Sequence, residues 1–547
     1  MVLNLASAYE RIAHHRGDSL ALHCGGISRT WAELDDRAAR LASVLGAVGV
    51  GPGDNVACAL YNSNEYIEVE YAAFKVRAAP CNVNYRYVES ELAYLIDNSD
   101  AKAVFFDSSL AERFGNVRQD LPDVRLWIQV GGDTRPDWAI SYESLIADND
   151  PAPSINREPS DLWILYTGGT TGNPKGVMWP HQNLVTISRR YYERLGHEPP
   201  STLDDVAPAA EAIANNGGTM RQLAASPLMH GTAGITALAV LLSGGSIVSL
   251  SAGSFDANEL WNTVEQQRCT FITIVGDVFA TPMVEALDAA AESGKPVDLT
   301  SLTGILSSGV MWSQPIKDRL LAHAGAAESD LTLIDSLGAS EGVGFGGTES
   351  SVADPGTATA KFTLGPFAAV FTEDGRRVKP GSGERGFLAV GGPIPLGYYG
   401  DPEKTAQTFR TFEGQRWSVP GDWATVESDE TITLLGRGSV SINTGGEKVY
   451  PEEVEEALKL LDDVVDANVV GVPDPRWGSV VVAVVESTTN ATSTDKELVD
   501  SLRTLLAGYK LPKHIVRVDK VFRSPNGKSD FKWAVKTARE ALGIPDS

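Results

Sequence analysis

The residues best suited to chemistry lie in one stretch, positions 164 to 178, which reads Ile-Leu-Tyr-Thr-Gly-Gly-Thr-Thr-Gly-Asn-Pro-Lys-Gly-Val-Met. An apolar, β-prone run ends here at glycines, hydroxyl residues and a lysine. Glycines let successive backbone N–H groups face one concavity, threonines add hydroxyl donors, and the lysine adds a positive charge. The pattern predicts a loop that grips phosphate, formed by Thr167, Gly168, Gly169, Thr170, Thr171, Gly172 and Lys175.

This loop differs from the Walker phosphate loop. Pro174 precedes the lysine, and Gly176 follows it where the Walker pattern has the Ser or Thr that binds magnesium. The stretch therefore predicts a nucleotide site of another kind. The alternative is a glycine-rich surface turn, but such turns rarely gather three glycines, two threonines and a lysine directly after a buried strand.

Further candidate residues stand at predicted strand ends downstream. Glu341 is the best magnesium ligand in the chain, because Mg²⁺ prefers hard carboxylate oxygens and keeps phosphate in its shell; the alternative is an ion-paired glutamate. Asp422 can accept hydrogen bonds from both ribose hydroxyls, and Arg437 can reach ribose or phosphate. His230 follows an apolar run, where a histidine is usually a core residue, although neighbouring glycines favour a binding role.

The elements that must position these residues alternate between strand and helix. Residues 28–107, and a second series from Asp256 onward, show a βαβ rhythm that predicts mostly parallel sheets covered by helices. A helix predicted over residues 181–195 would point its positive N-terminal end at the phosphates. The predicted fold is α/β: a large N-terminal body of stacked mixed βαβ sheets with a β-rich subdomain at 364–437, and a small mobile α+β C-terminal domain.

The domain boundary is expected between residues 1–437, a large N-terminal part, and residues 438–547, a smaller C-terminal part. Gly438 and Ser439 are the expected hinge, because glycine can absorb a large change in φ and ψ. Residues 108–160 are proline-rich and predict peripheral elements.

Length, charge and cysteine content limit the choice of function. A chain of 547 residues is too long for one core. Its formal charge of −25 argues against nucleic acid or an anionic membrane as the main partner, but a small anionic ligand such as a nucleotide needs only local positive charge. Neither a membrane span nor a signal peptide is indicated, so we expect a cytoplasmic protein. Four cysteines lack metal spacing and predict reduced structural thiols: Cys24, Cys58, Cys81 and Cys269.

Taken in order, the motifs resemble those of the adenylate-forming superfamily of acyl-CoA synthetases, stand-alone adenylation domains and beetle luciferases. The resemblance spans residues 28 to 534. Beside the phosphate loop it rests on Met229-His230-Gly231, on residues 304–311 and 333–342, on the Gly-Asp and Gly-Arg pairs at 421–422 and 436–437, and on the turn at 523–530. Members form an acyl-adenylate from an acid and ATP, and the acyl-CoA synthetases then transfer the acyl group to CoA.

The resemblance implies ATP, Mg²⁺ and CoA as cofactors and assigns roles to individual residues. The catalytic set is Lys528, Glu341, His230 and Thr170, of which Glu341 and Thr170 hold the metal. Nucleotide binding extends to Ser308, Gly309, Val310, Ser336, Leu337, Gly338, Ala339 and Ser340, besides Asp422 and Arg437. The acid pocket takes His230, Gly231, Thr232, Gly276, Asp277 and Gly338. A channel for the pantetheine arm would form from Gly445, Gly446, Glu447 and Lys448 when the C-terminal domain rotates.

Within the superfamily, residues 166–179, 436–443 and 446–454 are most similar in wording to actinobacterial acyl-CoA ligases that activate steroid side-chain or terpenoid carboxylates. The small residues Gly231, Ala233 and Gly234 are consistent with a roomy pocket. An alanine- and glycine-rich passage at 206–218 predicts either a segment that shapes this pocket or a mobile surface loop.

Two residues depart from the superfamily pattern and keep alternatives open. Leu337 stands where an aromatic residue commonly stacks beside adenine, and Ser340 replaces the usual threonine. One alternative is a chain that only forms the thioester from a supplied acyl-adenylate. Others are an adenylating enzyme that loads a carrier protein and a non-catalytic acyl- or nucleotide-binding protein. The expected partners are a small carboxylic acid, ATP and CoA, without nucleic acid or a membrane span, and a homodimer is compatible with the sequence.

Overall fold

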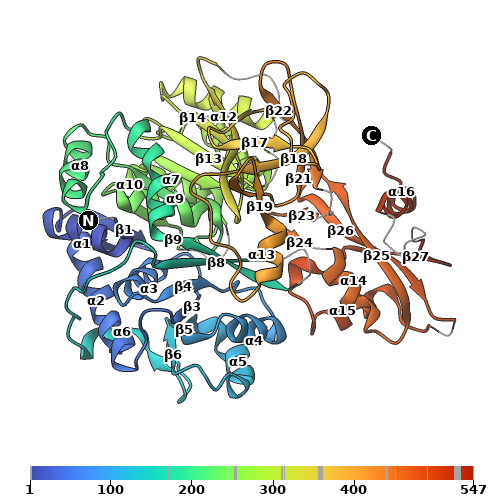
Figure 1. The fold of residues 1–547 in the computed structure, drawn as a ribbon, viewed down its shortest axis with the longest axis horizontal. Coiled ribbons are helices and arrows are strands. Elements are labelled where there is room, and N and C mark those ends of the chain that lie inside the picture. Colours follow the sequence, from blue (N-terminus) through green and yellow to red (C-terminus); the bar gives the residue numbers. More distant parts are fainter. Residues whose placement is uncertain are drawn as a thin grey trace.

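The structure is a computed structural model that describes residues 3–168, 173–251, 255–309, 312, 314–354, 361–437, 442–449, 451–489, 491–522 and 531–545. Within these residues the strands form three sheets. Two sheets and their helices make a large N-terminal body, and the third belongs to a smaller C-terminal domain beside it (Figure 1). The α/β prediction of a large body with a smaller C-terminal domain is confirmed.

The first sheet has the strand order β7-β6-β5-β3-β4-β8-β9 among the described residues. Its pairs are parallel except for the hairpin of β8 and β9. The central strands are buried on both faces, as expected for a parallel sheet with helices on each side. The strands are β3 (Asn55–Ala59), β4 (Ala79–Asn82), β5 (Ala101–Asp107), β6 (Leu126–Val130), β7 (Ile140–Ser141), β8 (Leu162–Gly168) and β9 (Pro174–Pro180).

Helices with well-defined ends connect these strands. A capping box starts the second helix, because the Glu33 amide donates to the Thr30 hydroxyl and the Thr30 amide donates to the Glu33 carboxylate. The helices in this part of the chain are α1 (Leu5–His15), α2 (Trp31–Ala47), α3 (Asn64–Lys75), α4 (Glu89–Asn98), η1 (Ser108–Leu110), α5 (Ala111–Val117), η2 (Arg118–Asp120), α6 (Tyr142–Asp148) and α7 (His181–Arg194).

The second sheet follows the order β20-β18-β21-β22-β16-β15-β14-β13-β12-β10-β11-β1-β2 through its middle, with β19 on β20 and β17 on β18. Its parallel part is β1 (Leu20–Cys24), β10 (Arg221–Ala224), β11 (Ser246–Ser249), β12 (Phe271–Ile274), β13 (Gly304–Ser308) and β14 (Thr332–Ala339). Strand β2 (Ile27–Thr30) is antiparallel to β1. Its helices are α8 (Leu203–Asn215), α9 (Gly231–Leu242), α10 (Ala257–Gln267), α11 (Gly276–Glu292) and α12 (Gln314–Ala326).

The β-rich subdomain continues this sheet through antiparallel pairs. It comprises β15 (Gly342–Ser351), β16 (Lys361–Leu364), β17 (Ala368–Phe371), β18 (Arg385–Val390), α13 (Pro402–Thr408), β19 (Phe409–Phe412), β20 (Gln415–Ser418), β21 (Asp422–Val426) and β22 (Thr431–Arg437). The C-terminal domain contains β23 (Ile442–Thr444), β24 (Glu447–Val449), α14 (Pro451–Lys459), β25 (Val464–Asp474), β26 (Gly478–Ser487), α15 (Asp495–Leu502), η3 (Gly508–Lys510), β27 (His514–Val518) and α16 (Phe531–Leu542).

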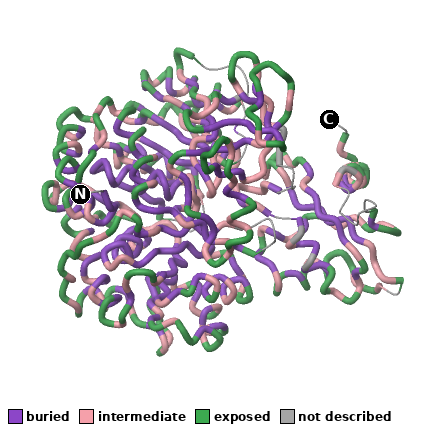
Figure 2. Tube along the Cα trace, in the orientation of Figure 1, coloured by how far each residue is buried: buried purple, intermediate pink, exposed green. Residues whose placement is uncertain are grey.

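The largest hydrophobic core joins strands of both sheets of the body to helices such as α3 and α9. Buried residues form much of the interior of the body (Figure 2). Helix α9 is apolar on nearly all sides because it is packed from both directions. A Cβ on its Gly234 would lie 2.6 Å from the Leu228 carbonyl oxygen and 3.4 Å from the Trp163 ring of β8. Gly234 is therefore needed for close packing, and Ala233 is fully buried. The prediction that these two small residues widen a pocket is wrong.

The interval 108–160 supplies β6 and β7 at one edge of the first sheet, which agrees with the prediction of peripheral elements. The prediction for residues 206–218 needs correction. The alanine-rich passage at 206–218 forms most of helix α8, which packs on α1 rather than on a pocket. The Arg16 guanidinium donates to the Ala210 carbonyl across that contact, 3.2 Å away.

Among the described residues, no helix has both the length and the apolar character needed to cross a bilayer. The four cysteines are free, as predicted, and burial raises the pKa of the Cys81 thiol to about 12.

Candidate active site

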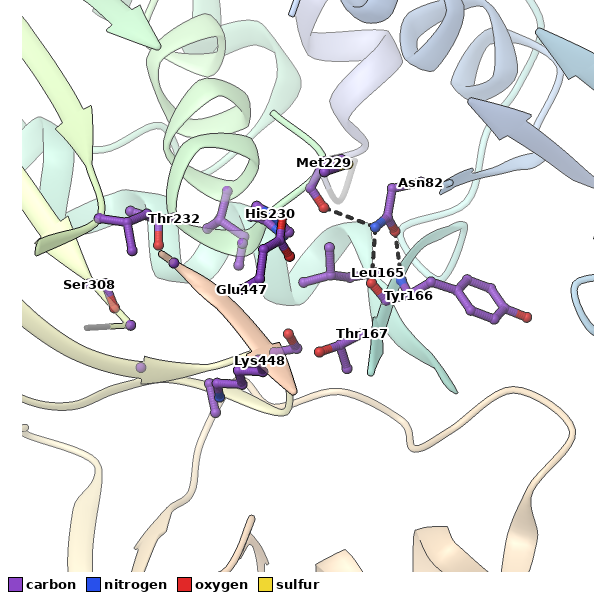
Figure 3. A pocket seen from close by; sticks show the side chains of 18 of the residues that line it. Asn82, Leu165, Tyr166, Thr167, Met229, His230, Thr232, Ser308, Glu447 and Lys448 are labelled. Atoms are coloured by element: carbon purple, nitrogen blue, oxygen red, sulfur yellow. Dashed lines mark hydrogen bonds and ion pairs between the residues drawn. The ribbon is translucent and has the colours of Figure 1, made fainter. Parts of the chain in front are cut away.

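A cavity of about 160 Å³ lies at the carboxyl ends of strands from both sheets of the body. This is the edge at which open α/β sheets bind ligands. Strands β4 and β8 reach it from the first sheet, and β12, β13 and β14 from the second. The lining includes Asn82, Leu165, Tyr166, Thr167, Met229, His230, Gly231, Thr232, Val275, Leu306, Ser308, Gly309, Ser336, Gly338, Ala339, Ser340, Gly446, Glu447 and Lys448 (Figure 3).

One side of the cavity, which we call the body wall, is formed by residues 82, 165–167 and 229. Asn82 holds it together: its amide nitrogen donates to the carbonyls of Tyr166 and Met229, each 2.9 Å away, and its oxygen accepts from the Tyr166 amide at 2.6 Å (Figure 3). Strand β8 is thus tied to the segment before α9. Asn82 was not predicted from the sequence, because an asparagine at the end of a strand occurs in many structural contexts.

The opposite side, the hairpin wall, is Gly446, Glu447 and Lys448 at the turn between β23 and β24. Gly445 and Gly446 have φ of +58° and +86°, which favours glycine. A Cβ on Gly446 would lie 3.1 Å from Val275 of the body, and one on Gly445 2.8 Å from the Trp477 ring. The predicted loop therefore touches the body closely in this structure.

Glu447 is the electrostatic centre of the hairpin wall. The Arg86 guanidinium donates to its carboxylate at 2.6 Å, and His230 Nε2 lies 3.4 Å from the same oxygen. Burial opposes ionisation of Glu447, but His230, Arg86 and Lys510 outweigh it and hold the pKa of this carboxyl below its usual range. Arg86 was a second residue missed from sequence, since it lies 361 positions from its partner.

The contact between the body and the C-terminal domain, which we call the seam, also includes Lys510 with Glu91 and Glu453. The Lys510 side chain is 4% exposed, and its ammonium pairs with Glu453 of α14 at 2.5 Å and with Glu91 of α4 in the body. Burial lowers the pKa of this lysine, but the two glutamates raise it by more than burial lowers it. The pKa of Lys510 is therefore above its usual range. The ammonium also lies 5.0 Å from the centre of the Tyr87 ring.

A second cavity, of about 330 Å³, opens beside the hairpin wall on the side of the C-terminal domain. It is lined by Arg86, Thr444, Gly445, Glu447, Trp477 and Lys513, among others. Glu447 lines both cavities. A narrow partner molecule could therefore approach the first cavity past this carboxylate.

The predicted adenine segment lines the first cavity through Ser336, Gly338, Ala339 and Ser340, joined by Ser308 and Gly309. Val310 lies outside the described residues. Leu337 is partly buried and packs against the body core instead of lining the cavity.

Glu341 is in the two-residue turn between β14 and β15. The Tyr398 hydroxyl donates to its carboxylate at 2.8 Å, and the Trp179 ring nitrogen donates to the Ser340 carbonyl at 3.0 Å. No described cluster of three or more His, Cys, Asp or Glu residues could hold a metal ion. A single carboxylate still suits Mg²⁺, because this ion keeps several waters or phosphate oxygens.

Lys175 forms an ion pair with Asp401, which also caps the start of α13. Residues 398–401 therefore contact both predicted site residues: Tyr398 bonds to Glu341, and Asp401 pairs with Lys175. Thr167 lines the cavity, and Gly168 pairs with Pro174 at the end of the hairpin. The predicted phosphate-binding residues Gly169, Thr170, Thr171 and Gly172 lie outside the described residues, as do Lys528 and the hinge pair Gly438-Ser439.

Asp422 and Arg437 are cross-strand partners at the ends of β21 and β22, so the structure brings together the two residues predicted to reach ribose. Asp422 is not among the described residues that line the cavity, and neither are Gly276 and Asp277. Gly276 begins α11, and its neighbour Val275 takes the lining position instead.

Comparison with known proteins adds independent information. Residues 9–399 match the family model of AMP-binding enzymes, and residues 453–528 match that of the AMP-binding enzyme C-terminal domain. The chain is 41% identical to a 3-oxocholest-4-en-26-oate–CoA ligase of Rhodococcus rhodochrous, covering 98% of this chain and 96% of the relative. It is 41% identical to a medium/long-chain-fatty-acid–CoA/3-oxocholest-4-en-26-oate–CoA ligase of Mycobacterium tuberculosis, covering 100% and 98%.

Solved structures agree on the fold. The amide bond synthetase McbA of Marinactinospora thermotolerans superposes with a TM-score of 0.79 at 24% identity, covering 98% of this chain and 99% of McbA. A variant of o-succinylbenzoate CoA synthetase from Bacillus subtilis gives a TM-score of 0.77 at 21% identity, covering 97% and 98%.

Proposed function

The chain belongs to the family of AMP-binding enzymes and is an acid–thiol ligase, and we propose that it makes the CoA thioester of a bulky hydrophobic carboxylic acid of the steroid or terpenoid type. The acid would first react with ATP to give an acyl-adenylate and pyrophosphate. The CoA thiol would then take the acyl group and release AMP. The observation that carries this proposal is the cavity shared by the body wall and the hairpin wall, beside a second cavity that Glu447 also lines.

In the first half-reaction, a carboxylate oxygen attacks the α-phosphorus of ATP and the bond to the pyrophosphate oxygen breaks. Positioning and electrostatic stabilisation supply most of the acceleration in such phosphoryl-type transfers. We propose that the phosphate loop from Thr167 to Lys175 holds the departing phosphates and that Asp422 fixes the ribose. Magnesium, which Glu341 and Thr170 would hold, neutralises phosphate charge when bound.

In the second half-reaction, the thiol sulfur bonds to the acyl carbon, the bond to the adenylate oxygen breaks, and the thiol proton passes to solvent or a nearby base. We propose that this conformation of the protein is the one suited to this step, because the hairpin wall places Gly446 and Glu447 at the cavity. Rotation about Gly438-Ser439 would exchange this wall for Lys528 during adenylation.

An assay of CoA-thioester formation tests the proposal, with acids ranging from short chains to polycyclic terpenoid and steroid acids. We expect the highest kcat/KM for the bulky acids, and a preference for short acids would contradict the proposed substrate class. In Lys528→Ala, adenylation should fall by about 100-fold or more, while CoA attack on a supplied acyl-adenylate should be nearly unchanged. Equal loss in both halves would contradict the role of Lys528.

One observation favours a second candidate function. Leu337, which stands where the resemblance leads one to expect an aromatic residue beside adenine, packs against the core. A chain that forms only the thioester from a supplied acyl-adenylate would tolerate this change. Release of pyrophosphate from acid and ATP alone would exclude that candidate, and a pantetheinylated carrier protein tested against free CoA would identify a carrier-loading enzyme.

We also propose a cytoplasmic location, supported by the four free cysteines and by the dependence of the reaction on ATP and CoA.

A further inference from the structure

One positively charged side chain lines the first cavity without a role in the reaction proposed above. Arg190 is near the end of α7 and contributes to the lining together with Thr232, Ile235, Thr236 and Val343. Of the described lysines and arginines, only Arg190 and Lys448 line this cavity. Arg190 is largely exposed to solvent, whereas Ile235 and Thr236 are buried.

Helices α7 and α9 are in contact, and Arg190 of α7 lines the same cavity as Thr236 of α9. The hydroxyl of Tyr191, the neighbour of Arg190, lies 3.1 Å from the Thr236 hydroxyl oxygen. Thr236 is six residues after His230, so it lies about 9 Å further along the helix axis at 1.5 Å per residue. We therefore place Arg190 toward the Thr236 side of the cavity, away from His230 and Glu447.

The hydrogen-bonding capacity of Arg190 is unused. Among the described residues its guanidinium makes no hydrogen bond or ion pair, and its central carbon lies over the Tyr191 ring, 5.2 Å from the ring centre. The Thr236 hydroxyl is already committed, since it donates to the Thr232 carbonyl at 2.7 Å. Five N–H donors thus stand beside a wall that also contains Ile235 and Val343.

We propose that Arg190 is a specificity residue that donates a hydrogen bond to an oxygen acceptor on the part of the acid farthest from its reacting carboxylate. This inference rests on the proposed function. The substrate class is thereby narrowed to hydrophobic acids with a carbonyl oxygen at the remote end. The acid in the names of the relatives has this chemical pattern, with an oxo group at position 3 and its carboxylate at position 26.

The geometry gives Arg190 two effects on selection. A guanidinium bond to a carbonyl is a charge-assisted hydrogen bond, which is stronger than a neutral one, although exposure to water reduces its net value. With an acid that lacks the acceptor, the Arg190 guanidinium hydrogen-bonds to water instead, and the binding free energy of the charge-assisted hydrogen bond is lost. Because this contact is far from the carboxylate, it also favours one orientation of a long acid in the cavity over the reverse orientation.

The test compares 3-oxocholest-4-en-26-oate with the same acid lacking the 3-oxo group, using the full-length protein. The measured quantity is the ratio of kcat/KM for the two acids in thioester formation. Wild type should favour the oxo acid by about tenfold, the factor that one net hydrogen bond of this kind supplies. Arg190→Met, which keeps the length of the side chain without its donors, should bring the ratio close to one, and Arg190→Lys should give an intermediate value.

The matched control is Arg189→Met, at the neighbouring exposed position that does not line the cavity. It should keep the wild-type ratio. A wild-type ratio near one, or an unchanged ratio in Arg190→Met, would overturn the inference. Arg190→Lys keeps the test valid if the methionine variant fails to fold.

Failure of the proposed function gives a different result, namely no thioester from either acid with wild-type protein. Calorimetric binding of the two acids then replaces the rate measurement. An affinity ratio of about tenfold that disappears in Arg190→Met would support the role of Arg190 in acid recognition, and equal affinities would reject it.

Discussion

The two walls of the first cavity are built from different interactions. The body wall is held by neutral hydrogen bonds from a buried asparagine and by packing between two sheets. The hairpin wall is held by ion pairs that cross from one domain to the other, Arg86 with Glu447 and Lys510 with Glu91. The first kind of contact cannot be lost without disturbing the core, while the second can be exchanged for water or other partners.

This difference shows which side of the site can move. Buried ion pairs contribute little net stability, because desolvation offsets much of the attraction between the charges. A domain docked mainly through such pairs is held in a defined position without a large free energy. The contrast therefore supports the proposal that the C-terminal domain leaves this position during the reaction cycle while the body stays unchanged.

The largest effect is expected in the body wall. Asn82→Ala would leave the Tyr166 amide and the carbonyls of Tyr166 and Met229 without their partner, at a cost of about 3–5 kcal/mol in unfolding free energy. Urea unfolding measures this loss. Asn84→Ala is the control: its side chain meets Tyr509 at 3.5 Å and caps its own turn, so a loss of about 1 kcal/mol is expected. Equal losses would contradict the contrast between the walls.

A smaller effect concerns Glu70, which supports the body wall by accepting a hydrogen bond from the Trp163 ring nitrogen at 2.9 Å. Burial raises the pKa of Glu70 to about 8, although the bond to Trp163 opposes the change. The folded protein therefore keeps a proton that the unfolded chain has released above its ordinary pKa, and stability falls as pH rises from that value to about 8.

Glu70→Gln should remove this pH dependence and raise the unfolding free energy at pH 8 by about 4 kcal/mol. Unfolding curves between pH 5 and pH 8 measure it. Glu65→Gln, at a partly exposed position of the same helix, should leave the profile as in wild type. A Glu70→Gln profile parallel to that of wild type would refute the assignment.

The smallest effect is expected at the seam. Lys510→Met would leave Glu91 and Glu453 without their shared cation and weaken docking of the C-terminal domain by about 2 kcal/mol. Thioester formation from a supplied acyl-adenylate should fall roughly 10- to 30-fold, with unfolding of the body unchanged. Glu91→Gln loosens the same contact from the body side, and exposed Lys520→Met is the control. Loss of body stability in Lys510→Met would show that the seam is part of the core.

The sequence predicted the architecture well where strand and helix patterns are local. The parallel sheets, the β-rich subdomain and the C-terminal strand at residues 514–518 follow from periodicity and turn residues, and the motif residues at strand ends do converge. Ser308, Ser336 and His230 meet at one cavity, although they are far apart in the chain.

What the sequence did not predict depends on partners that only folding brings together. Lys510 meets Glu91 across 419 positions, and Asn82 meets Met229 across 147, so no spacing rule could connect them. Arg190 was overlooked because a helix-end arginine is usually solvated. Gly276 and Asp277 were placed one residue too far along, since the helix starts at Gly276 and only Val275 faces the cavity.

The pairing of Lys175 with Asp401 has a consequence for nucleotide exchange. Asp401 uses Oδ1 to accept from the Lys404 amide at 2.8 Å and Oδ2 to hold Lys175, so losing the lysine does not remove the cap of α13. If Lys175 holds the phosphates as proposed above, an arriving triphosphate would replace Asp401 as the partner of its ammonium, so the gain and the loss of binding free energy at this residue would nearly cancel. After pyrophosphate leaves, Asp401 would pair with the ammonium again.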